Sequence, residues 1–531
     1  MIKMTWPTAA CALVLTAAAP ALAQTKADAP IAVRIDTSAR GAKIDRNIFG
    51  QFAEHLGSGI YGGVWVGKDS PIPNTRGIRK DVVEALKAIK VPNVRWPGGC
   101  FADEYHWRHG VGPIAGRRKT INSNWGGAVE PNTFGTDEFM DFVDQIGSEA
   151  YVSVNVGSGT VQEAAEWVEY MTADPSTTAG KERAANGHPA PYKVKYLGIG
   201  NESWSCGGAM RPEYYADEMK RYARFVRNYN PKQTGAEAMQ RIAVGPNQAD
   251  PAYTEAVMAA QKGHDWAWNI EGLSLHSYTT GGWPPSYSST KFDETAYAKL
   301  LKETLGMDAL VTQHAAIMDK YDPDKKVPLV VDEWGVWLAP LEGTDPGFLV
   351  QQNSLRDAIV AALNLNIFAR HADRVRMTNI AQMVNVLQAM ILTDKDKMVL
   401  TPTYHVYKMY LPFQDASFVP VNFDAGTYTQ GDVKLPRIDA TAVRDTQGKL
   451  WLAITNLDPD RPATIVPKLP GVEAASAKGQ VLTAARVDAF NTFAAPNTVS
   501  PKPYTAKTSA KGLTLDIPPK SLVVVQLEPE V

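Results

Sequence analysis

Cysteine is the residue type that this sequence uses least, with three in 531 residues. Cys11 lies in an apolar N-terminal segment, which leaves Cys100 and Cys206 for the remainder of the chain. Two cysteines cannot build the disulfide framework on which small secreted domains depend, so the fold must be stabilised by a hydrophobic core. Whether these two form a bridge or remain free thiols is open, because a bridge requires close Cα atoms.

An excess of charge of one sign is also absent. The sequence has 54 Lys and Arg residues against 56 Asp and Glu residues, a formal net charge of -2. Such a chain has no field that attracts nucleic acid, which we therefore exclude as an expected partner. Histidine is scarce too, and His106 and His109 have no evident third ligand, so no metal site is expected.

Long hydrophobic runs are absent after the N-terminal segment. Residues 9–19 are almost wholly apolar, and the sequence Ala-Leu-Ala at 21–23 precedes Gln24. This pattern is typical of an export signal with its cleavage site, and the run is too short to span a membrane comfortably. We therefore expect residues 1–23 to be a signal peptide, and the mature chain to be secreted or periplasmic and free of the membrane.

A regular alternation of two patterns fills the chain from about residue 46 to residue 400. Short apolar runs that end in polar residues alternate with longer stretches of helical periodicity, such as 136–147 and 351–371. This alternation is typical of βα units, and it predicts an α/β fold with a (β/α)8 TIM barrel over 46–400. The expected strands are 48–52, 93–96, 151–155, 196–200, 241–245, 273–276, 329–333 and 380–385.

Helical periodicity disappears in the remainder of the chain, residues 401–531. Short β-rich runs are separated there by Gly, Pro, Asp and Asn. This pattern predicts a C-terminal β-sandwich, jelly-roll-like, as a second domain. Because chain termini often lie together, we expect the segment 24–45 to contribute a strand to this sandwich.

Two of the predicted barrel strands end close to a glutamate. Glu202 follows the run at 196–200, and Glu333 follows the run at 329–331. In TIM barrels the active site gathers at the C-terminal ends of the strands. Retaining glycoside hydrolysis needs a carboxylic acid and a carboxylate about 5 Å apart, which these two residues can supply. The alternative is that each is an ordinary strand-end carboxylate in a salt bridge or a helix cap.

Five sequence blocks surround these positions. They are FAEHLG (52–57), NVRWPGGCFAD (93–103), NESW (201–204), LSLHSY (273–278) and DEWGVW (332–337). In this order they resemble the α-L-arabinofuranosidases of glycoside hydrolase family 51. An isolated Asn-Glu pair would be a weak signal, but five blocks in the right order form a specific one.

The resemblance implies a retaining, exo-acting enzyme that releases terminal arabinofuranosyl groups from plant cell-wall glycans and uses no cofactor. Glu202 would be the acid/base and Glu333 the nucleophile. The partner would be an arabinose-containing oligosaccharide or polysaccharide, and assembly into a homo-oligomer is in keeping with the family.

The same resemblance gives roles to polar residues at other strand ends. Asn201 would bind the hydroxyl group beside the anomeric carbon. Glu54, His276, Tyr278 and Gln382 would contact the sugar or a catalytic glutamate. The residues expected to support the site are Arg95, Trp96, Cys100, Cys206 and Trp337.

Structural alternatives remain for several of these residues. Glu54 and Arg95 could form a buried ion pair, and His276 could be a satisfied core histidine. Gln382 and Asn385 could have purely structural amide roles. Seven tryptophans lie near the predicted barrel mouth, of which we expect one or two to form subsite walls: Trp65, Trp107, Trp125, Trp204, Trp283, Trp334 and Trp337.

One position departs from the family pattern. Part of the family has an asparagine directly after the Gly-Gly of the second block and uses it to contact the sugar, whereas this chain has Cys100. That contact is therefore not carried over. A Cys100 that faces Cys206 near the cleft would be a feature of this branch.

Two other functions stay open at this point. The same barrel and glutamate pair could serve an endo-β-glucanase or a xylosidase, because a fold does not fix a function. A non-catalytic carbohydrate-binding protein is a further alternative, although it would be expected to have lost at least one catalytic carboxylate, and both are present.

Overall fold

The structure is a computed structural model that describes residues 29–262, 270–471, 474–508 and 512–529. The predicted signal peptide at 1–23 lies outside these residues. Eight parallel strands form a closed barrel, as the sequence predicts. These strands are β2 (Gly50–Phe52), β5 (Asn93–Trp96), β8 (Glu149–Val154), β9 (Val194–Ile199), β10 (Gln240–Ala243), β11 (Gly272–Thr279), β12 (Leu329–Val336) and β13 (Val375–Ile380).

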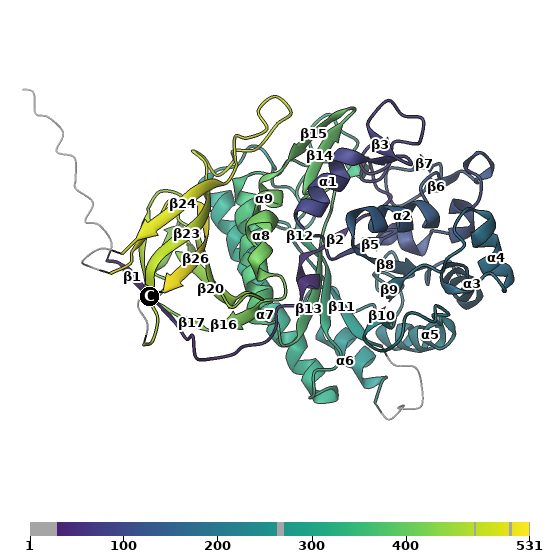
Figure 1. Cartoon of the computed structure of the whole chain (residues 1–531), viewed down its shortest axis with the longest axis horizontal. Coiled ribbons are helices and arrows are strands. Elements are labelled where there is room, and N and C mark those ends of the chain that lie inside the picture. Colours follow the sequence, from purple (N-terminus) through teal and green to yellow (C-terminus); the bar gives the residue numbers. More distant parts are fainter. Residues whose placement is uncertain (1–28, 263–269, 472–473, 509–511, 530–531) are drawn as a thin grey trace, which may run out of the picture.

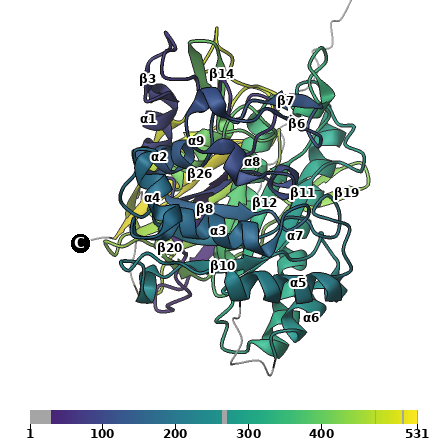
Figure 2. The same ribbon diagram turned by 90° about the vertical axis from the view of Figure 1, so that its right-hand side faces the viewer.

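Helices surround the barrel (Figure 1). The α-helices are α1 (Lys80–Ala88), α2 (Thr136–Ile146), α3 (Val161–Thr172), α4 (Thr178–Ala185), α5 (Pro212–Phe225), α6 (Pro251–Ala259), α7 (Glu294–Tyr321), α8 (Leu355–Arg370) and α9 (Pro402–Met409). In Figure 2, α3 and α4 face the viewer and strands of the second domain lie behind them. Helix α2 ends at Gly147, whose φ of 73° is the left-handed conformation that glycine adopts at low cost.

The barrel strands are buried on both faces. Every residue of β9 and of β12 is buried, which explains why these strands are nearly continuous apolar runs instead of alternating ones. Tyr151, Tyr196, Ile242, Val330 and Met377 form a cluster of buried residues contributed by five different barrel strands. This cluster closes the barrel, so a substrate site can form only at an end of it.

The prediction for the eighth strand was wrong. We expected it at 380–385, whereas β13 ends at Ile380 and the chain then forms an irregular segment. The segment is buried but is held by side-chain amides: Asn385 donates to Ser58 O at 3.0 Å and to Thr393 Oγ1 at 2.8 Å. A short apolar run does not distinguish a strand from a buried loop that is fixed in this way.

The second domain is a β-sandwich. Its larger sheet has the order β16-β20-β21-β26-β23-β24, and its smaller sheet has the order β17-β1-β22-β25. The bounds are β1 (Ile31–Ile35), β16 (Ser417–Val419), β17 (Val421–Asn422), β20 (Ile438–Arg444), β21 (Leu450–Asn456), β22 (Ala463–Lys468), β23 (Ala474–Leu482), β24 (Lys502–Lys507), β25 (Leu515–Ile517) and β26 (Ser521–Pro529). Strand β1 pairs in parallel with β22 and antiparallel with β17. The domain boundaries at residues 45 and 400 remain our proposal.

Alternation along the strands gives the larger sheet two apolar faces. Leu450, Leu452 and Ile454 of β21 join Val33 and Ile35 of β1 in the core between the two sheets. The side chains that alternate with these along the strands point to the other face of the sheet. Ala453 of β21 and Val524 of β26 are examples, and they belong to the main core, which also contains residues of α8.

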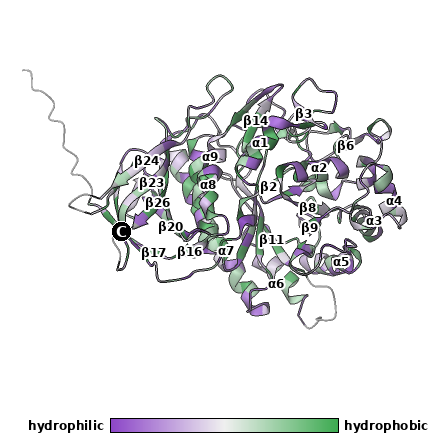
Figure 3. Cartoon of the chain, in the orientation of Figure 1, coloured by the Kyte–Doolittle hydropathy of each residue, from purple (hydrophilic) through white to green (hydrophobic). Residues whose placement is uncertain are grey.

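Helix α8 lies between the barrel and the larger sheet. It is buried at every residue from Leu355 to Ala369, including the polar residues Asn364 and Asn366. Figure 3 shows hydrophobic residues along α8 and β11, whereas α5 at the surface carries many hydrophilic ones. The two domains therefore share one continuous packing layer.

Short hairpins and 3-10 helices complete the described chain. The hairpin strands are β3 (Asn74–Thr75), β4 (Ile78–Arg79), β6 (Thr120–Asn122), β7 (Ala128–Glu130), β14 (Ile391–Asp394), β15 (Lys397–Leu400), β18 (Thr427–Gln430) and β19 (Val433–Pro436). The 3-10 helices are η1 (Arg46–Phe49), η2 (Cys100–Asp103), η3 (Trp107–Gly110), η4 (Ile114–Gly116), η5 (Gly235–Glu237), η6 (Pro346–Phe348) and η7 (Leu411–Phe413). Among the described residues, no helix combines the length and the apolar character needed to cross a membrane.

Candidate active site

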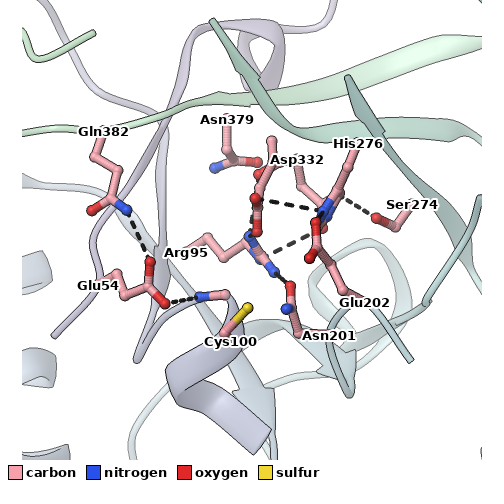
Figure 4. A network of polar contacts seen from close by, with 12 residues as sticks. Glu54, Arg95, Cys100, Asn201, Glu202, Ser274, His276, Asp332, Asn379 and Gln382 are labelled. Atoms are coloured by element: carbon pink, nitrogen blue, oxygen red, sulfur yellow. Dashed lines mark hydrogen bonds and ion pairs between the residues drawn. The ribbon is translucent and has the colours of Figure 1, made fainter. Parts of the chain in front are cut away.

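Two glutamates face each other at the C-terminal end of the barrel. Glu202 follows β9 and Glu333 lies in the last part of β12. One carboxylate oxygen of each, together with a ring nitrogen of His276, lie within 4.8 Å of one another. Figure 4 shows Glu202 and His276 converging with Arg95 and Asn201. The structure therefore brings together the two residues on which the prediction of a catalytic pair depends.

Two donors hold the carboxylate of Glu333 in one orientation. Arg95 Nη1 donates to Oε1 at 2.8 Å, and the hydroxyl group of Tyr278 donates to Oε2 at 2.8 Å. The Gly-Gly of the second block makes this approach possible, because a Cβ atom on Gly99 would lie 2.7 Å from Glu333 Oε1. Glu333 is thus buried, oriented and close to a cation.

Glu202 is in a different electrostatic environment. Burial raises its pKa, a hydrogen bond between its Oε1 and His276 Nδ1 at 2.8 Å opposes the rise, and the charge of Glu333 adds to it. A carboxyl group whose pKa is raised can remain protonated at a pH at which an ordinary glutamate is ionised. The pair therefore has the asymmetry that acid catalysis beside a charged nucleophile requires.

Asp332 lies beneath the pair and was given no role in the sequence analysis. It accepts a hydrogen bond from Tyr151 at 2.7 Å and another from Ser274, and it lies 3.2 Å from His276 Nε2. Burial alone would raise the pKa of Asp332, but Arg95 and His276 outweigh burial and lower it. Asp332 is therefore an ionised carboxylate inside the barrel.

A bulge in β12 explains why Asp332 and Glu333 both reach the interior. Val330 pairs with Ser274, and the next paired residues are Glu333 and His276. Strand β12 therefore advances by three residues over a stretch in which β11 advances by only two. The pairing with β13 has a corresponding shift. An extra residue interrupts the alternation of a strand, so neighbouring side chains no longer point to opposite faces.

His276 is protonated in this setting. Burial alone would lower its pKa, but the charges of Glu333 and Asp332 and the contact with Glu202 outweigh burial and raise the pKa to about 10. Both nitrogens of a protonated ring are donors, and each nitrogen of His276 faces a carboxylate: Nδ1 faces Glu202 at 2.8 Å and Nε2 faces Asp332 at 3.2 Å.

Glu54 forms a second polar centre of the site. Its carboxylate accepts from Gly99 N at 2.9 Å, from Trp125 Nε1 at 2.9 Å and from Gln382 Nε2 at 2.9 Å. Burial, and then the charge of Glu333, raise the pKa of Glu54 to about 7. The alternative role of Glu54 was a buried ion pair with Arg95. This pair is not formed, because Arg95 contacts Glu333 and Asp332 instead.

Asn201 links Arg95 to the loop that carries Glu202. Its Oδ1 accepts from Arg95 Nη2 at 2.6 Å, and its backbone N donates to Asp103 at 2.8 Å. Asp103 is buried and also accepts from Val156 N at 2.7 Å, so it ties together the segments after β5, β8 and β9. Sequence reasoning assigned no role to Asp103, although it is the last residue of the block NVRWPGGCFAD (93–103).

An aromatic wall joins the two polar centres. We use this name for Tyr278, Trp337 and Trp125: the ring centroids of Tyr278 and Trp337 are 5.1 Å apart, and those of Trp337 and Trp125 are 6.4 Å apart. Tyr278 contacts Glu333 at one end, and Trp125 contacts Glu54 at the other. Trp125 and Trp337 are therefore the two candidates for the one or two tryptophans that we expect to form a subsite wall.

Other predicted residues lie away from the cluster. Trp96 is fully buried, stacks on Phe139 with centroids 4.7 Å apart and donates to His55 Nε2 at 3.1 Å, so the structure does not bring it to the site. It follows Arg95 in β5 and points to the opposite face of the strand. The remaining tryptophans of the predicted group include three that are buried in the core: Trp65, Trp107 and Trp334.

Cys100 and Cys206 form a disulfide bond. Their Sγ atoms are 2.11 Å apart and their Cα atoms 5.5 Å apart. The bond connects η2 after β5 with the loop after β9, and Sγ of Cys206 lies 3.6 Å from Glu202 Oε2. The bond therefore fixes the loop that carries Glu202.

We expect removal of this disulfide to destabilise the protein. A bond that spans 106 residues limits the unfolded chain, so the double variant Cys100→Ala/Cys206→Ala should lose about 2–5 kcal/mol in its free energy of unfolding. Urea denaturation followed by circular dichroism measures this change, with oxidised and dithiothreitol-treated wild type as the matched pair. Equal urea midpoints for that pair would contradict the prediction.

Comparison with known protein families gives a consistent result. A family model described as the α-L-arabinofuranosidase 1 domain matches residues 85–305, and one described as the α-L-arabinofuranosidase C-terminal domain matches residues 332–521. An intracellular exo-α-L-arabinofuranosidase of Bacteroides ovatus is 47% identical over 488 residues, which cover 91% of this chain and 93% of that protein.

Solved structures agree with these matches. The arabinofuranosidase of glycoside hydrolase family 51 from Xanthomonas axonopodis pv. citri has 52% identity and a TM-score of 0.90, with 94% of this chain and 100% of that chain covered. The arabinose complex of the α-L-arabinofuranosidase from Thermotoga maritima has 31% identity, a TM-score of 0.79 and the same coverage of 94% and 100%.

The predicted export of the protein is corrected by these comparisons. The Bacteroides ovatus relative is named as an intracellular enzyme, which contradicts a secreted or periplasmic location. The prediction depended on the composition of residues 1–23, which lie outside the described residues. A short apolar segment with small residues is a compositional pattern, and composition alone does not establish that the segment is recognised for export.

Proposed function

Since the chain belongs to the α-L-arabinofuranosidases of glycoside hydrolase family 51, and is an exo-acting glycoside hydrolase, we propose that it releases terminal arabinofuranosyl groups from plant cell-wall glycans with retention of configuration. Glu202 acts as the acid/base and Glu333 as the nucleophile. The relatives described above, at 31–52% identity, are all named arabinofuranosidases, which favours this function over an endo-β-glucanase, a xylosidase or a binding protein.

The separation of the two carboxylates is the observation that carries this proposal. Retaining glycosidases keep their carboxyl groups about 5–5.5 Å apart, whereas inverting ones separate them by about 6.5–9.5 Å to admit a water molecule. Oxygens of Glu202 and Glu333 lie within 4.8 Å of each other. This distance favours direct attack by Glu333 on the anomeric carbon.

The first chemical step uses the asymmetry between the two groups. Glu333, held by Arg95 and Tyr278, attacks the anomeric carbon while Glu202 donates its proton to the departing glycosidic oxygen. The products are a glycosyl ester on Glu333 and a leaving group that carries the proton of Glu202.

The second step reverses the role of Glu202. Formation of the ester removes the negative charge of Glu333, and this charge is one of the causes that raise the pKa of Glu202. The pKa of Glu202 therefore falls, and its carboxylate takes a proton from the water that attacks the ester. The site is thus able to supply both an acid and a base from one residue.

The other predicted residues have binding or positioning roles in this proposal. Glu54 and Gln382 bind sugar hydroxyl groups at the end of the site away from Glu202. Gln382 Oε1 is buried and has no hydrogen-bond partner among the described residues, so it is free to accept a hydrogen bond from the sugar. Asn201 binds the hydroxyl group next to the anomeric carbon, and Arg95 positions both Asn201 and Glu333. Association into a homo-oligomer remains a proposal based on the family.

Hydrolysis of aryl glycosides by the full chain tests the proposed function. We expect activity on 4-nitrophenyl α-L-arabinofuranoside, with α-L-arabinofuranose as the first product seen by proton NMR before mutarotation. A first product of β configuration would overturn the retaining mechanism. Activity confined to the corresponding β-xyloside or β-glucoside would move the function to the alternative hydrolases.

Replacement of His276 should shift the pH dependence in a defined direction. The protonated ring lowers the pKa of Glu202, so His276→Gln raises that pKa, and the alkaline limb of kcat/KM moves to higher pH. The value of kcat/KM itself falls because Glu202 loses the donor that orients it. His106→Gln, which removes an exposed histidine paired with Glu163, is the control. An unchanged alkaline limb would contradict this role.

The same histidine links protonation to stability. Its folded-state pKa of about 10 is above the ordinary value of 6.5. Its stabilising contribution is therefore complete below about pH 6.5 and is lost as the pH rises through about 10. Wild type should thus lose more stability than His276→Gln between these two pH values.

A further inference from the structure

Trp283 is the most exposed of the large hydrophobic residues in the described part of the chain, with 73% of its surface accessible. It lies in the segment between β11 and α7, which leaves the barrel next to the predicted nucleophile strand. Exposure of an indole ring to water is unfavourable, since a buried tryptophan gains stability from the hydrophobic effect. Single exposed apolar residues are common in soluble proteins, so the neighbours of Trp283 must decide whether its position has a function.

Trp283 continues the aromatic wall outward. Its ring packs edge-on against Trp337 with centroids 5.5 Å apart, and Trp337 in turn packs edge-on against Tyr278 with centroids 5.1 Å apart. Tyr278 donates to Glu333. A row of aromatic rings thus leads from the nucleophile to the solvent, and Trp283 is at its outer end.

The segment that carries Trp283 is fixed at both of its ends. Glu303 of α7 accepts from Thr280 N at 2.9 Å and from Gly281 N at 2.7 Å. On the other side, Ala339 N donates to Tyr287 O at 3.1 Å. A side chain presented by an anchored segment loses little conformational entropy when a ligand binds.

An exo-acting site determines what can reach Trp283. In the proposed function, the terminal sugar occupies the inner part of the site, between Glu333 and Glu54, so the remainder of the glycan extends toward the solvent on the leaving-group side. A residue at the outer rim can therefore contact only the leaving-group sugars. The flat, apolar face of a sugar ring suits an exposed indole, because its C–H groups pack on the aromatic face.

We propose that Trp283 is a stacking platform for a sugar ring on the leaving-group side, and so determines the preference of the enzyme for glycan over aryl leaving groups. This inference depends on the proposed function. It assigns to Trp283 a specificity role that differs from the roles of Tyr278, Trp337 and Trp125, which line the inner site.

Comparison of two substrates tests the inference on the full chain. The probes are 4-nitrophenyl α-L-arabinofuranoside and a linear α-linked arabinofuranosyl trisaccharide. For Trp283→Ala, the ratio of kcat/KM on the trisaccharide to kcat/KM on the aryl substrate should fall about tenfold, mainly through a higher KM on the trisaccharide. Trp283→Phe should recover most of the ratio, because a ring remains. Tyr214→Ala, which removes an exposed aromatic residue of α5, should leave the ratio at the wild-type value.

Each contrary result has a distinct meaning. An unchanged ratio for Trp283→Ala, or an equal loss on both substrates, would overturn the platform. A lower molecular mass by light scattering together with equal losses would identify Trp283 as a contact between copies of the chain. A wild-type protein that is inactive on both arabinofuranosides would instead refute the proposed function, which separates the two failures.

Discussion

Glu333→Ala should lower kcat on 4-nitrophenyl α-L-arabinofuranoside by roughly four to six orders of magnitude. Without the carboxylate no glycosyl ester can form, and the charge that stabilises the developing positive charge at the anomeric carbon is lost as well. Arg95 and Tyr278 would lose the hydrogen bonds that they donate to Glu333. Because alanine has no group that titrates, a change of pH should not restore activity. Steady-state kinetics on purified protein measure this loss.

Added azide gives this variant a distinctive product. The space left by the Glu333 side chain admits a small anion on the face from which the carboxylate attacks. One displacement from that face inverts the anomeric centre, so the product should be the β-configured arabinofuranosyl azide. An α-configured azide would show that Glu333 is not the nucleophile. Glu163→Gln, a change on α3 beside His106, serves as a control for general loss of activity.

Glu202→Ala should separate substrates according to their leaving group. Loss of the acid should cost about two to four orders of magnitude in kcat/KM on a glycan, whose departing alkoxide needs a proton. A dinitrophenyl arabinofuranoside needs no such help, so its first step should survive and be followed by slow hydrolysis of the ester. Stopped-flow measurements should then show a burst of dinitrophenolate followed by a slow steady state.

Azide should rescue Glu202→Ala by a different route. The ester on Glu333 still forms, and azide attacks it from the side on which Glu202 would have activated water. Two displacements restore the original configuration, so the product should be the α-configured azide. Opposite configurations from the two alanine variants would assign both roles in one experiment. The same configuration from both would contradict the assignment of at least one residue.

The sequence predicts the fold and the catalytic pair for one shared reason. Barrel strands are buried on both faces, so they are recognisable as apolar runs, and a polar residue at the end of such a run stands out. Glu202 and Glu333 are found in this way, whereas His276 is assigned through the family resemblance. The closed barrel and the sandwich are confirmed by the structure, although the eighth strand ends where the prediction had it begin.

What the sequence could not reveal depends on local geometry and on contacts between distant segments. Asp332 should point away from Glu333 in a regular strand, and only the bulge in β12 brings both into the barrel. Trp96 follows Arg95 directly, but alternation along β5 directs its side chain to the opposite face of the strand, where it packs on Phe139. The bond between Cys100 and Cys206 joins loops 106 residues apart, and no local pattern gives their distance.

The position of α8 and β1 also has a consequence for the order in which the protein can be built. Ile31 and Ala32 pair with Ile465 and Val466, so the first described strand waits for its partner until most of the chain has been synthesised. Helix α8 meets the same delay, because the sheet that covers it is formed by β20, β21 and β26. A barrel that has emerged from the ribosome before the C-terminal strands therefore exposes α8, and this interval is when the nascent protein is most prone to aggregate.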